Sequence, residues 1–291
     1  MSLTVVSVLH DSGGEIGEMI DSLGMLGTPA PEVICVDSGS GDDGPAIAAA
    51  RGARVIDLQG NPGYGAACNA GVSAASGEAC ILLNPDTRLV DDGLLRLATV
   101  ALAAPVIVAP RLAYPDGSPQ ASAHPVPGGS GAFLAAVLPP RLLPPRLRGR
   151  LEPFRSGVPV AAGWAIGACL VASTALLRRL GPFDPGVFLY AEDMDLCLRA
   201  REAGVPVVFR PDVTVIHSGG HSTGTLGRQG RLELQARRRR EVIAERLGPG
   251  ALRRDDRAQA LAFGLRAAAG RRRDENRAKL AALRAAQKSP S

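Results

Sequence analysis

The sequence predicts an α/β protein with an open, mostly parallel, doubly wound sheet and a helical, basic C-terminal extension. Through about the first 110 residues, short β-rich apolar runs alternate with alanine-rich or amphipathic stretches, which is the rhythm of βαβ units. The runs are nearly continuous rather than alternating, as in strands that are covered on both faces. Beyond residue 225 the pattern is helical and rich in arginine.

The first five strands are expected at the apolar runs. Because helical stretches separate the runs, right-handed crossovers place the strands in one sheet. Such a sheet binds ligands outside the carboxyl ends of its strands, so the polar residues that follow each run are the first candidates for a site. The runs begin near Leu3, Glu32, Ala53, Ala79 and Val106.

The alternation of strands and helices ends after Pro110. The segment RLAYPDGSPQ predicts a hairpin with a Pro-Asp-Gly turn. Residues 125–150 are rich in proline and glycine and predict a loop or lid, with an apolar patch at 133–138 as a candidate membrane contact. A second ordered block follows, with a strand at GACLVAS, a helix over Glu192–Ala203 and one or two strands ending at His217.

Charge divides the chain into two unequal parts. Residues 1–225 hold 15 basic and 21 acidic side chains, whereas residues 226–291 hold 18 basic and 7 acidic ones. The basic extension predicts peripheral contact with an anionic membrane surface, and a solvated helical face is the alternative. Aromatic residues make up only 3% of the chain, so no stacking platform supports nucleic-acid binding.

The N-terminal run predicts a cytoplasmic protein. The run lacks a basic leading segment and is interrupted by His10 and Asp11, which favours a buried strand over a signal peptide. Residues 157–177 are uncharged, but Pro159 and the glycines favour a strand and turn over a membrane span. Widely spaced cysteines without a C-x-x-C pair are expected in a reduced core. They are Cys35, Cys68, Cys80, Cys169 and Cys197.

The first candidate site follows the strand that begins at Glu32. The side chains of Asp37, Ser38 and Ser40 stand directly after this strand. Carboxylate and hydroxyl groups at this edge can bond the base or ribose of a nucleotide. A turn closed by the Asp37 side chain is the alternative.

The second candidate is NPGYGAACNAG, over residues 61–71. Gly63 and Gly65 allow the backbone to approach a ligand, and a helix that begins here attracts phosphate to its N-terminus. We assign Asn61 and Asn69, the two amide side chains of the segment, to donor binding.

The third candidate follows the apolar run ACILL. Asn84-Pro85-Asp86 places a carboxylate directly after a buried strand at the centre of the predicted sheet. Mg²⁺ or Mn²⁺ held by one or two carboxylates takes its remaining ligands from water and substrate phosphates, so Asp86 is a candidate ligand with Asn84 beside it. A turn formed by Asn-Pro-Asp is the alternative.

Two further groups lie in the later block. Glu192 and Asp193 open a predicted helix, where they either cap free N–H groups or present Asp193 to a cleft as a general base. His217 ends a predicted strand and His221 follows in a glycine-rich loop. A structural role is the alternative for either histidine, whereas one beside a phosphate and metal site is a natural ligand.

Taken in order, the segments VDSGSGD, NPGYGAACNAG, LLNPD, GWAIGACLVAS, GPFDPGVFLYAEDMDLCLRAREAG and HSGGHSTG resemble glycosyltransferase family 2, most closely its actinobacterial rhamnosyltransferases. The resemblance covers about residues 4–223. It implies a GT-A fold and inverting transfer of a sugar, with L-rhamnose from dTDP-rhamnose as the closest match, to a glycan or lipid-linked acceptor of cell-wall or surface polysaccharide. It also implies a domain over 1–225, with nucleotide-binding (1–110) and acceptor (111–225) halves, before the extension at 226–291.

The resemblance also implies roles for single residues. Asp37 would meet the nucleotide base, and Asp86 would ligate the divalent cation, with His217 near the diphosphate and metal. Asp193, beside Glu192, would be the catalytic base. The segment that would line the sugar and acceptor site contributes Gly163, Trp164 and Gly167.

The sequence departs from the family pattern at three positions. Asn84 replaces the first acid of the metal motif, which puts strict dependence on a metal in doubt. Ser38 stands where asparagine is usual, and Asp43 stands where glycine is usual.

The residues by themselves also allow other functions. An NAD-dependent oxidoreductase would share the early βαβ rhythm, but the turn after the first strand, HDSGGEIG, lacks G-x-G-x-x-G. A UDP- or GDP-linked sugar is the alternative donor within the family, and a nucleic-acid-binding protein is the alternative outside it. A homodimer also remains open.

Overall fold

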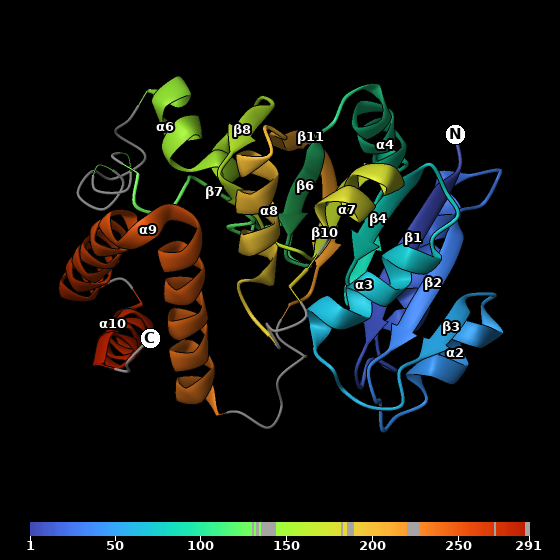
Figure 1. Cartoon of the computed structure of the whole chain (residues 1–291), viewed down its shortest axis with the longest axis horizontal. Coiled ribbons are helices and arrows are strands. Elements are labelled where there is room, and N and C mark those ends of the chain that lie inside the picture. The colour runs from blue at the N-terminus through green and yellow to red at the C-terminus, as the bar shows by residue number, and fades with distance from the viewer. Residues whose placement is uncertain are drawn as a thin grey trace.

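The structure is a computed structural model that describes residues 1–129, 131, 134, 144–181, 183–184, 189–219, 227–270 and 272–288. Strands form a central sheet, helices cover both of its faces, and two long helices extend from one end of the molecule (Figure 1). The predicted α/β class and the helical C-terminal extension are therefore confirmed.

The first half of the sheet follows the predicted parallel order. All seven residues of the first strand are buried, as expected for a strand covered on both faces. The sheet runs β3-β2-β1-β4, and every neighbouring pair is parallel. These strands are β1 (Leu3–Leu9), β2 (Glu32–Asp37), β3 (Arg54–Asp57) and β4 (Ala79–Leu83).

The second half of the sheet is mixed, which the sequence did not predict. β10 lies antiparallel between β4 and β6, so the run at Val106 does not continue the parallel order beside β4. The order continues β4-β10-β6-β11-β5, with β8 beside β11, and β7 pairs with β9 in a separate ribbon. Their bounds are β5 (Thr87–Leu89), β6 (Ile107–Ala113), β7 (Ala123–His124), β8 (Val160–Ala162), β9 (Trp164–Ala165), β10 (Cys169–Ser173) and β11 (Val207–His217).

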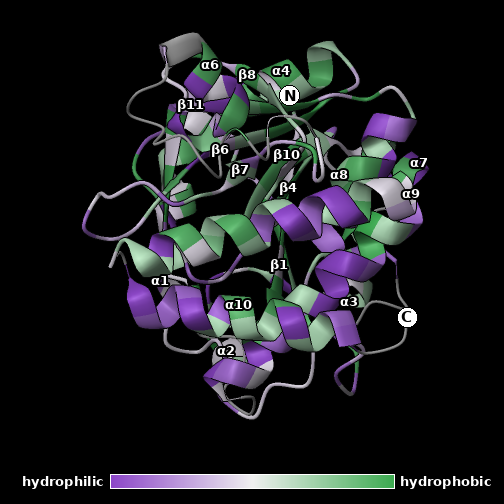
Figure 2. Ribbon diagram, turned by 90° about the vertical axis from the view of Figure 1, so that its left-hand side faces the viewer, coloured by the Kyte–Doolittle hydropathy of each residue, from purple (hydrophilic) through white to green (hydrophobic). Residues whose placement is uncertain are grey.

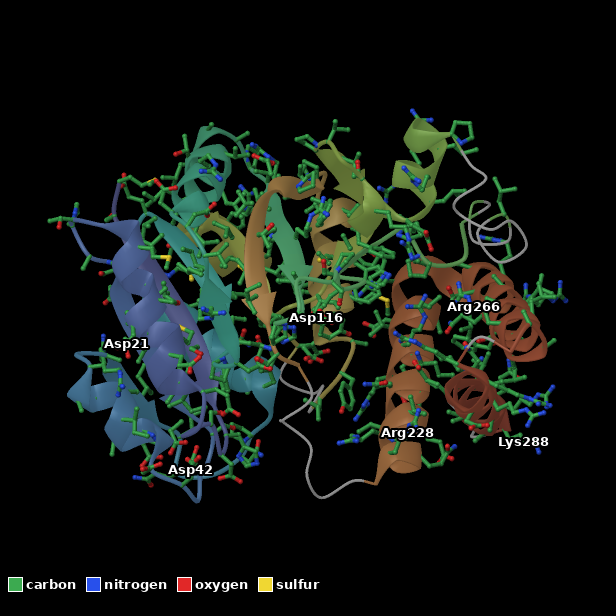
Figure 3. The ribbon with its side chains drawn as sticks, turned by 180° about the vertical axis from the view of Figure 1, so that it is seen from behind. Asp21, Asp42, Asp116, Arg228, Arg266 and Lys288 are labelled. Carbon is green, nitrogen blue, oxygen red and sulfur yellow. The ribbon has the colours of Figure 1, made fainter. Side chains whose placement is uncertain are left out.

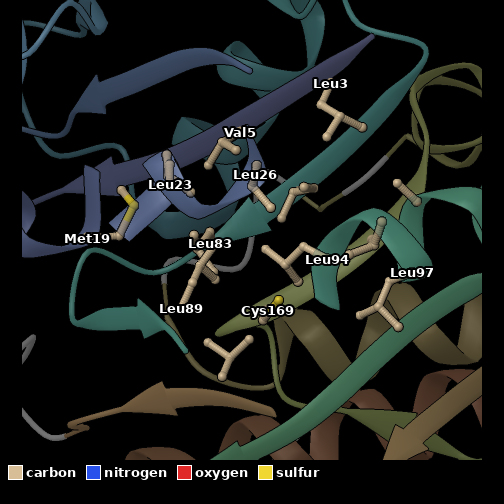
Figure 4. Close-up of a cluster of buried hydrophobic side chains, with 14 of the residues drawn as sticks. Leu3, Val5, Met19, Leu23, Leu26, Leu83, Leu89, Leu94, Leu97 and Cys169 are labelled. Atoms are coloured by element: carbon tan, nitrogen blue, oxygen red, sulfur yellow. The ribbon is translucent and has the colours of Figure 1, made fainter. Parts of the chain in front are cut away.

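Alternate residues of the central strands feed two separate cores. Val5 and Ile81 point to one face, where α1 and α4 pack with the cluster of Figure 4, whereas Val6 and Leu82 point to the other face. Gly71 brings α3 so close to Val6 that no Cβ would fit. The helices are α1 (Ile16–Ser22), α2 (Gly44–Ala50), α3 (Tyr64–Ala74), α4 (Gly93–Ala103), α6 (Pro145–Leu151), α7 (Thr174–Leu180) and α8 (Glu192–Glu202), with short 3₁₀ turns at Leu23–Leu26 and Pro153–Arg155.

The extension consists of α9 (Arg228–Ala268) and α10 (Arg273–Lys288). α9 bends at Gly248, whose φ of 78° is not helical. Its first part packs against α8 through a third apolar cluster that includes Met194, Leu198 and Ile243. The extension thus shares a core with the helix that begins at Glu192.

Several predicted features lie outside the described residues. They are a part of the Pro- and Gly-rich loop at 125–150, most of its apolar patch at 133–138, and His221. The end of the predicted loop is not a loop but belongs to α6. None of the described helices is long and apolar enough to cross a lipid bilayer.

Candidate functional site

The carboxyl ends of β1 and β2 bring the first candidate residues together. Asp37 Oδ1 accepts a hydrogen bond from the Ser40 N–H at 3.0 Å, so the turn expected as the alternative does form. The Ser38 hydroxyl donates to Asn61 Oδ1 at 3.1 Å, and the same oxygen accepts from the Gly63 N–H at 3.0 Å. These contacts join the first two candidate segments into one loop cluster beside β1.

The glycine-rich segment at the start of α3 is packed against a later part of the chain. A Cβ on Gly65 would lie 2.9 Å from Phe183 Cβ, so close packing requires a glycine here. Asn69 donates to the Phe183 carbonyl at 2.8 Å and accepts from the Phe183 N–H at 3.0 Å. Both groups of the Asn69 amide thus have main-chain partners, and its predicted contact with the donor stays a prediction.

Asp86 and His217 meet because β5 pairs with the end of β11 in antiparallel register. His217 Nε2 lies 3.3 Å from Asp86 Oδ1, and both side chains are nearly buried. The Gly219 N–H donates to Asp86 Oδ2 at 2.9 Å. On the far side of the ring, His217 Nδ1 lies 2.8 Å from Gln120 Oε1, while Gln120 Nε2 donates to the His217 carbonyl.

The Gln120 contacts orient the His217 ring. Because the Gln120 amide nitrogen donates to a carbonyl, its oxygen acts as the acceptor for Nδ1–H, which leaves Nε2 directed at Asp86. Burial alone would raise the pKa of Asp86, but hydrogen bonding from His217, the His217 charge and the Gly219 N–H together hold it below its usual value. With both ring nitrogens protonated the two side chains form an ion pair, and a cation that takes the place of the Nε2 proton would meet an ionised oxygen and a ring nitrogen side by side.

This pair fits a divalent cation that takes its remaining ligands from elsewhere. Among the residues that the structure describes, no three acidic, histidine or cysteine side chains converge on one point. Mg²⁺ and Mn²⁺ are commonly held by one or two protein groups together with water and substrate phosphates, so two ligands suffice. A surface pocket borders Asp86 and Ser218 and reaches Glu15 at the start of α1.

Asp193 is held at the start of α8. Its Oδ2 accepts from the Gly167 N–H at 3.0 Å and its Oδ1 from the Met194 N–H at 2.7 Å. Burial raises its pKa despite these two donors. Burial and the adjacent Asp193 charge also raise the pKa of Glu192 to about 8. Two neighbouring, partly buried carboxyl groups with raised pKa values are typical of sites that move protons.

The backbone before α8 is strained. Tyr190 and Ala191 have φ values of 70° and 65°, in the left-handed region that side chains with a Cβ rarely adopt. Such conformations cost on the order of 1 kcal/mol or more each and cluster at functional sites. Here they set the direction from which Glu192 and Asp193 enter the helix.

Tyr64 connects the Asp193 and Asn84 regions. Its hydroxyl lies 3.2 Å from Asn84 Oδ1 and 3.4 Å from the Gly167 carbonyl. The Asn84 N–H donates to the Ala168 carbonyl at 3.0 Å. Asn84, at the end of the strand that leads to Asp86, is therefore bonded to Ala168, and the neighbouring Gly167 holds Asp193.

Two side chains contact the ring of Trp164. His124 stacks on it with ring centroids 4.2 Å apart. The Arg239 guanidinium of α9 lies 5.9 Å from the centre of the ring and makes a cation–π contact with it. Gly163 packs so closely on Val126 that a Cβ would clash. The indole N–H is buried without a partner among the described residues.

The sequence did not identify three residues of this arrangement. Gln120 follows a predicted turn, and nothing in its local pattern points to His217. Tyr64 lies in the segment that was chosen for its glycines, and its being the one aromatic residue of that segment is the signal that could have identified it. Arg239 belongs to the arginine-rich extension, whose contacts depend on how α9 docks.

Comparison with known proteins places this geometry in a family. Residues 4–157 match the model of the family described as Glycosyl transferase family 2. The N-acetylglucosaminyl-diphospho-decaprenol L-rhamnosyltransferase of Mycobacterium tuberculosis is 33% identical over 242 residues, which covers 76% of this chain and 78% of that protein.

Solved glycosyltransferases share the fold. The mannosyltransferase PcManGT from Pyrobaculum calidifontis, in complex with GDP-Man and Mn²⁺, aligns with a TM-score of 0.63 at 18% identity over 98% of this chain and 85% of that one. Glucosyl-3-phosphoglycerate synthase from Mycobacterium tuberculosis, with Mn²⁺ and UDP, gives 0.54 at 19% identity over 85% and 81%. The expected GT-A fold is confirmed.

Proposed function

Because the chain belongs to glycosyltransferase family 2, we propose that it transfers L-rhamnose from dTDP-rhamnose, with inversion, to a hydroxyl of a lipid-linked glycan acceptor in cell-wall or surface polysaccharide assembly. The mycobacterial relative, named for a rhamnosyl transfer to a decaprenol-linked sugar, supports this donor and acceptor. The proposal includes a cytoplasmic location with peripheral contact between the basic extension and an anionic membrane. The placement of Asp193 against Gly167, one peptide segment from Asn84, carries the chemical part of the proposal.

Asp193 is the proposed general base. It takes the proton from the acceptor hydroxyl while that oxygen attacks the anomeric carbon. The bond from that carbon to the diphosphate oxygen breaks, and the electron pair leaves with the nucleotide diphosphate. A pKa raised by burial makes the carboxylate a stronger base, and the Gly167 N–H fixes its orientation.

Asp86 and His217 are proposed to hold the cation. A bound Mg²⁺ or Mn²⁺ supplies positive charge that offsets the charge on the departing diphosphate. Asp37, Ser38, Ser40 and Asn61 are proposed to contact the nucleotide, since their loops meet at the ends of β1 and β2. Trp164 and Gly167 are proposed to line the acceptor site, next to Asp193.

A donor screen tests the proposal. Nucleotide diphosphate release and thermal stabilisation are measured with dTDP-rhamnose, UDP-glucose, UDP-galactose and GDP-mannose, each with Mg²⁺, Mn²⁺ or EDTA. We expect stabilisation and turnover with dTDP-rhamnose that require the cation. Stabilisation by another donor alone would refute rhamnose while keeping the family, and equal turnover in EDTA would refute the cation.

A further inference from the structure

The outer end of the extension is a pair of packed helices. After the bend at Gly248, α9 lies side by side with α10, and both helices run across one end of the molecule (Figure 2). We call residues 250–270 and 272–288 the terminal hairpin. Its inner side is apolar, with Ala258, Ala282 and Leu283 buried. Packing between the two helices therefore accounts for the residues on the inner side but not for those on the outer side.

α10 presents a basic stripe on this outer side. The spacing of four, seven and four residues places the members on one side of a helix, opposite the buried Ala286. All of them are exposed: Arg273, Arg277, Arg284 and Lys288. Among the described residues of the terminal hairpin, Asp274 is the one exposed acidic side chain.

α9 adds two exposed leucines next to arginines. Arg253, Arg257, Leu261 and Leu265 follow one another at intervals of four, so they form a second stripe along the helix. Leu261 is 37% exposed and Leu265 is 42% exposed. Exposed leucines within a basic amphipathic helix are typical of helices that lie in a membrane interface.

The terminal hairpin is held by the first part of α9 and by the body of the protein. Asp255, which is almost fully buried, accepts from Arg239 Nη2 at 2.8 Å and from Arg239 Nε at 3.0 Å. Arg254 also donates to the Gly128 carbonyl at 2.7 Å. Figure 3 shows Arg266 and Lys288 of the terminal hairpin at the end of the molecule opposite Asp21 and Asp42. The chain thus carries Arg266 and Lys288 at one end, and Asp21 of α1 and Asp42 at the other.

We propose that the outer face of the terminal hairpin is the docking surface for an anionic phospholipid bilayer, with the arginines at the headgroups and Leu261 and Leu265 at the acyl boundary. Charge complementarity favours this partner over a second copy of the same basic face, which would be repelled. The stripes contain no aromatic residue on which a base could stack, so they fit a lipid surface better than single-stranded nucleic acid. The inference deepens the proposed membrane contact by naming its surface.

Vesicle flotation without donor or acceptor tests this surface independently of the transferase activity. Each basic residue near an anionic surface contributes about a five-fold factor to partitioning. Removing four of them should therefore weaken binding to phosphatidylglycerol vesicles by about 600-fold, with little binding of either protein to phosphatidylcholine. The test variant replaces four exposed residues by glutamine: Arg257, Arg273, Arg277 and Arg284.

A matched variant removes the same charge from the rest of the surface. Its four exposed arginines, also changed to glutamine, are Arg54, Arg150, Arg179 and Arg201. We expect it to bind vesicles nearly as wild type, and Leu261→Ser with Leu265→Ser to reduce binding without changing thermal stability. Equal loss in both arginine variants would overturn the assignment, because binding would then follow net charge alone. Tighter binding to an oligonucleotide than to the vesicles, or dimerisation that the leucine changes abolish, would overturn it as well.

Discussion

Arg246 joins the C-terminal extension to the helix that carries Asp193, and its removal should destabilise the whole protein. Asp195 lies two residues after Asp193, and its side chain is only 3% exposed. Its Oδ1 accepts from Arg246 Nε and its Oδ2 from Arg199 Nε, both at 2.7 Å. Arg246→Met keeps most of the length of the side chain but leaves Oδ1 buried without a charged partner.

The magnitude follows from the burial of the carboxylate. Removing one partner of a buried ion pair costs about 3–5 kcal/mol. The Arg246 side chain is 21% exposed and Arg199 remains in place, so we expect the lower end, about 3 kcal/mol. At about 2–4 °C per kcal/mol for a protein of this size, the melting temperature should fall by about 6–12 °C.

Urea unfolding followed by circular dichroism measures this change, with thermal melting as a second readout. Arg237→Met is the matched control on the same helix, because Arg237 is half exposed and its pair with Glu241 at 3.8 Å should contribute less than about 1 kcal/mol. If Arg246→Met unfolds at the same urea concentration as Arg237→Met, the buried ion pair does not hold the extension in place.

Three further predictions concern the site. Asp193→Asn should lower turnover by about 10²–10⁴-fold while leaving donor binding nearly intact, and near-normal turnover would remove Asp193 from the role of base. Gln120→Leu should weaken Mn²⁺ binding, followed by electron paramagnetic resonance, by about 10–100-fold, whereas Gln120→Glu, which keeps an acceptor for His217, should not. Because the pKa of Glu192 is raised from 4.5 to about 8, the folded protein holds a proton that the unfolded chain releases, so stability should fall as pH rises through this range. Glu192→Gln should flatten that fall, and identical slopes for the two proteins would contradict the raised pKa.

The sequence predicted the strands that are buried on both faces, because such strands are continuous apolar runs. It did not predict the order of the strands, which depends on contacts between residues far apart in the chain. The runs at Leu3 and Ala79 are apolar on both faces because helices cover both sides, which is visible in the residues themselves. The place of β10 between β4 and β6 is not visible, since GACLVAS would read the same at an edge or at the centre of a sheet. Likewise, Asp86 follows its strand directly, whereas Gln120 reaches His217 only through the pairing of β5, β6 and β11.

The net basic charge of the extension does not reveal that its arginines have two different roles. The sequence presents one basic segment, but the structure divides its arginines into two groups. Arg239, Arg240 and Arg246 pair with the acidic residues Asp255, Asp256 and Asp195, and so they hold the extension together and fasten it to α8. The second group consists of the exposed arginines in the stripes of the terminal hairpin. Substitutions of these arginines leave the ion pairs of the first group intact.

This division determines which experiments can be interpreted. Deleting everything after residue 226 would remove the exposed arginines, but it would also expose Met194 and Leu198 and leave Asp195 without Arg246. Lost activity in such a deletion would therefore follow from a disturbed α8 whether or not the protein docks on a membrane. Point substitutions in the exposed stripes keep the α8 contacts, so they separate the contribution of docking from that of folding.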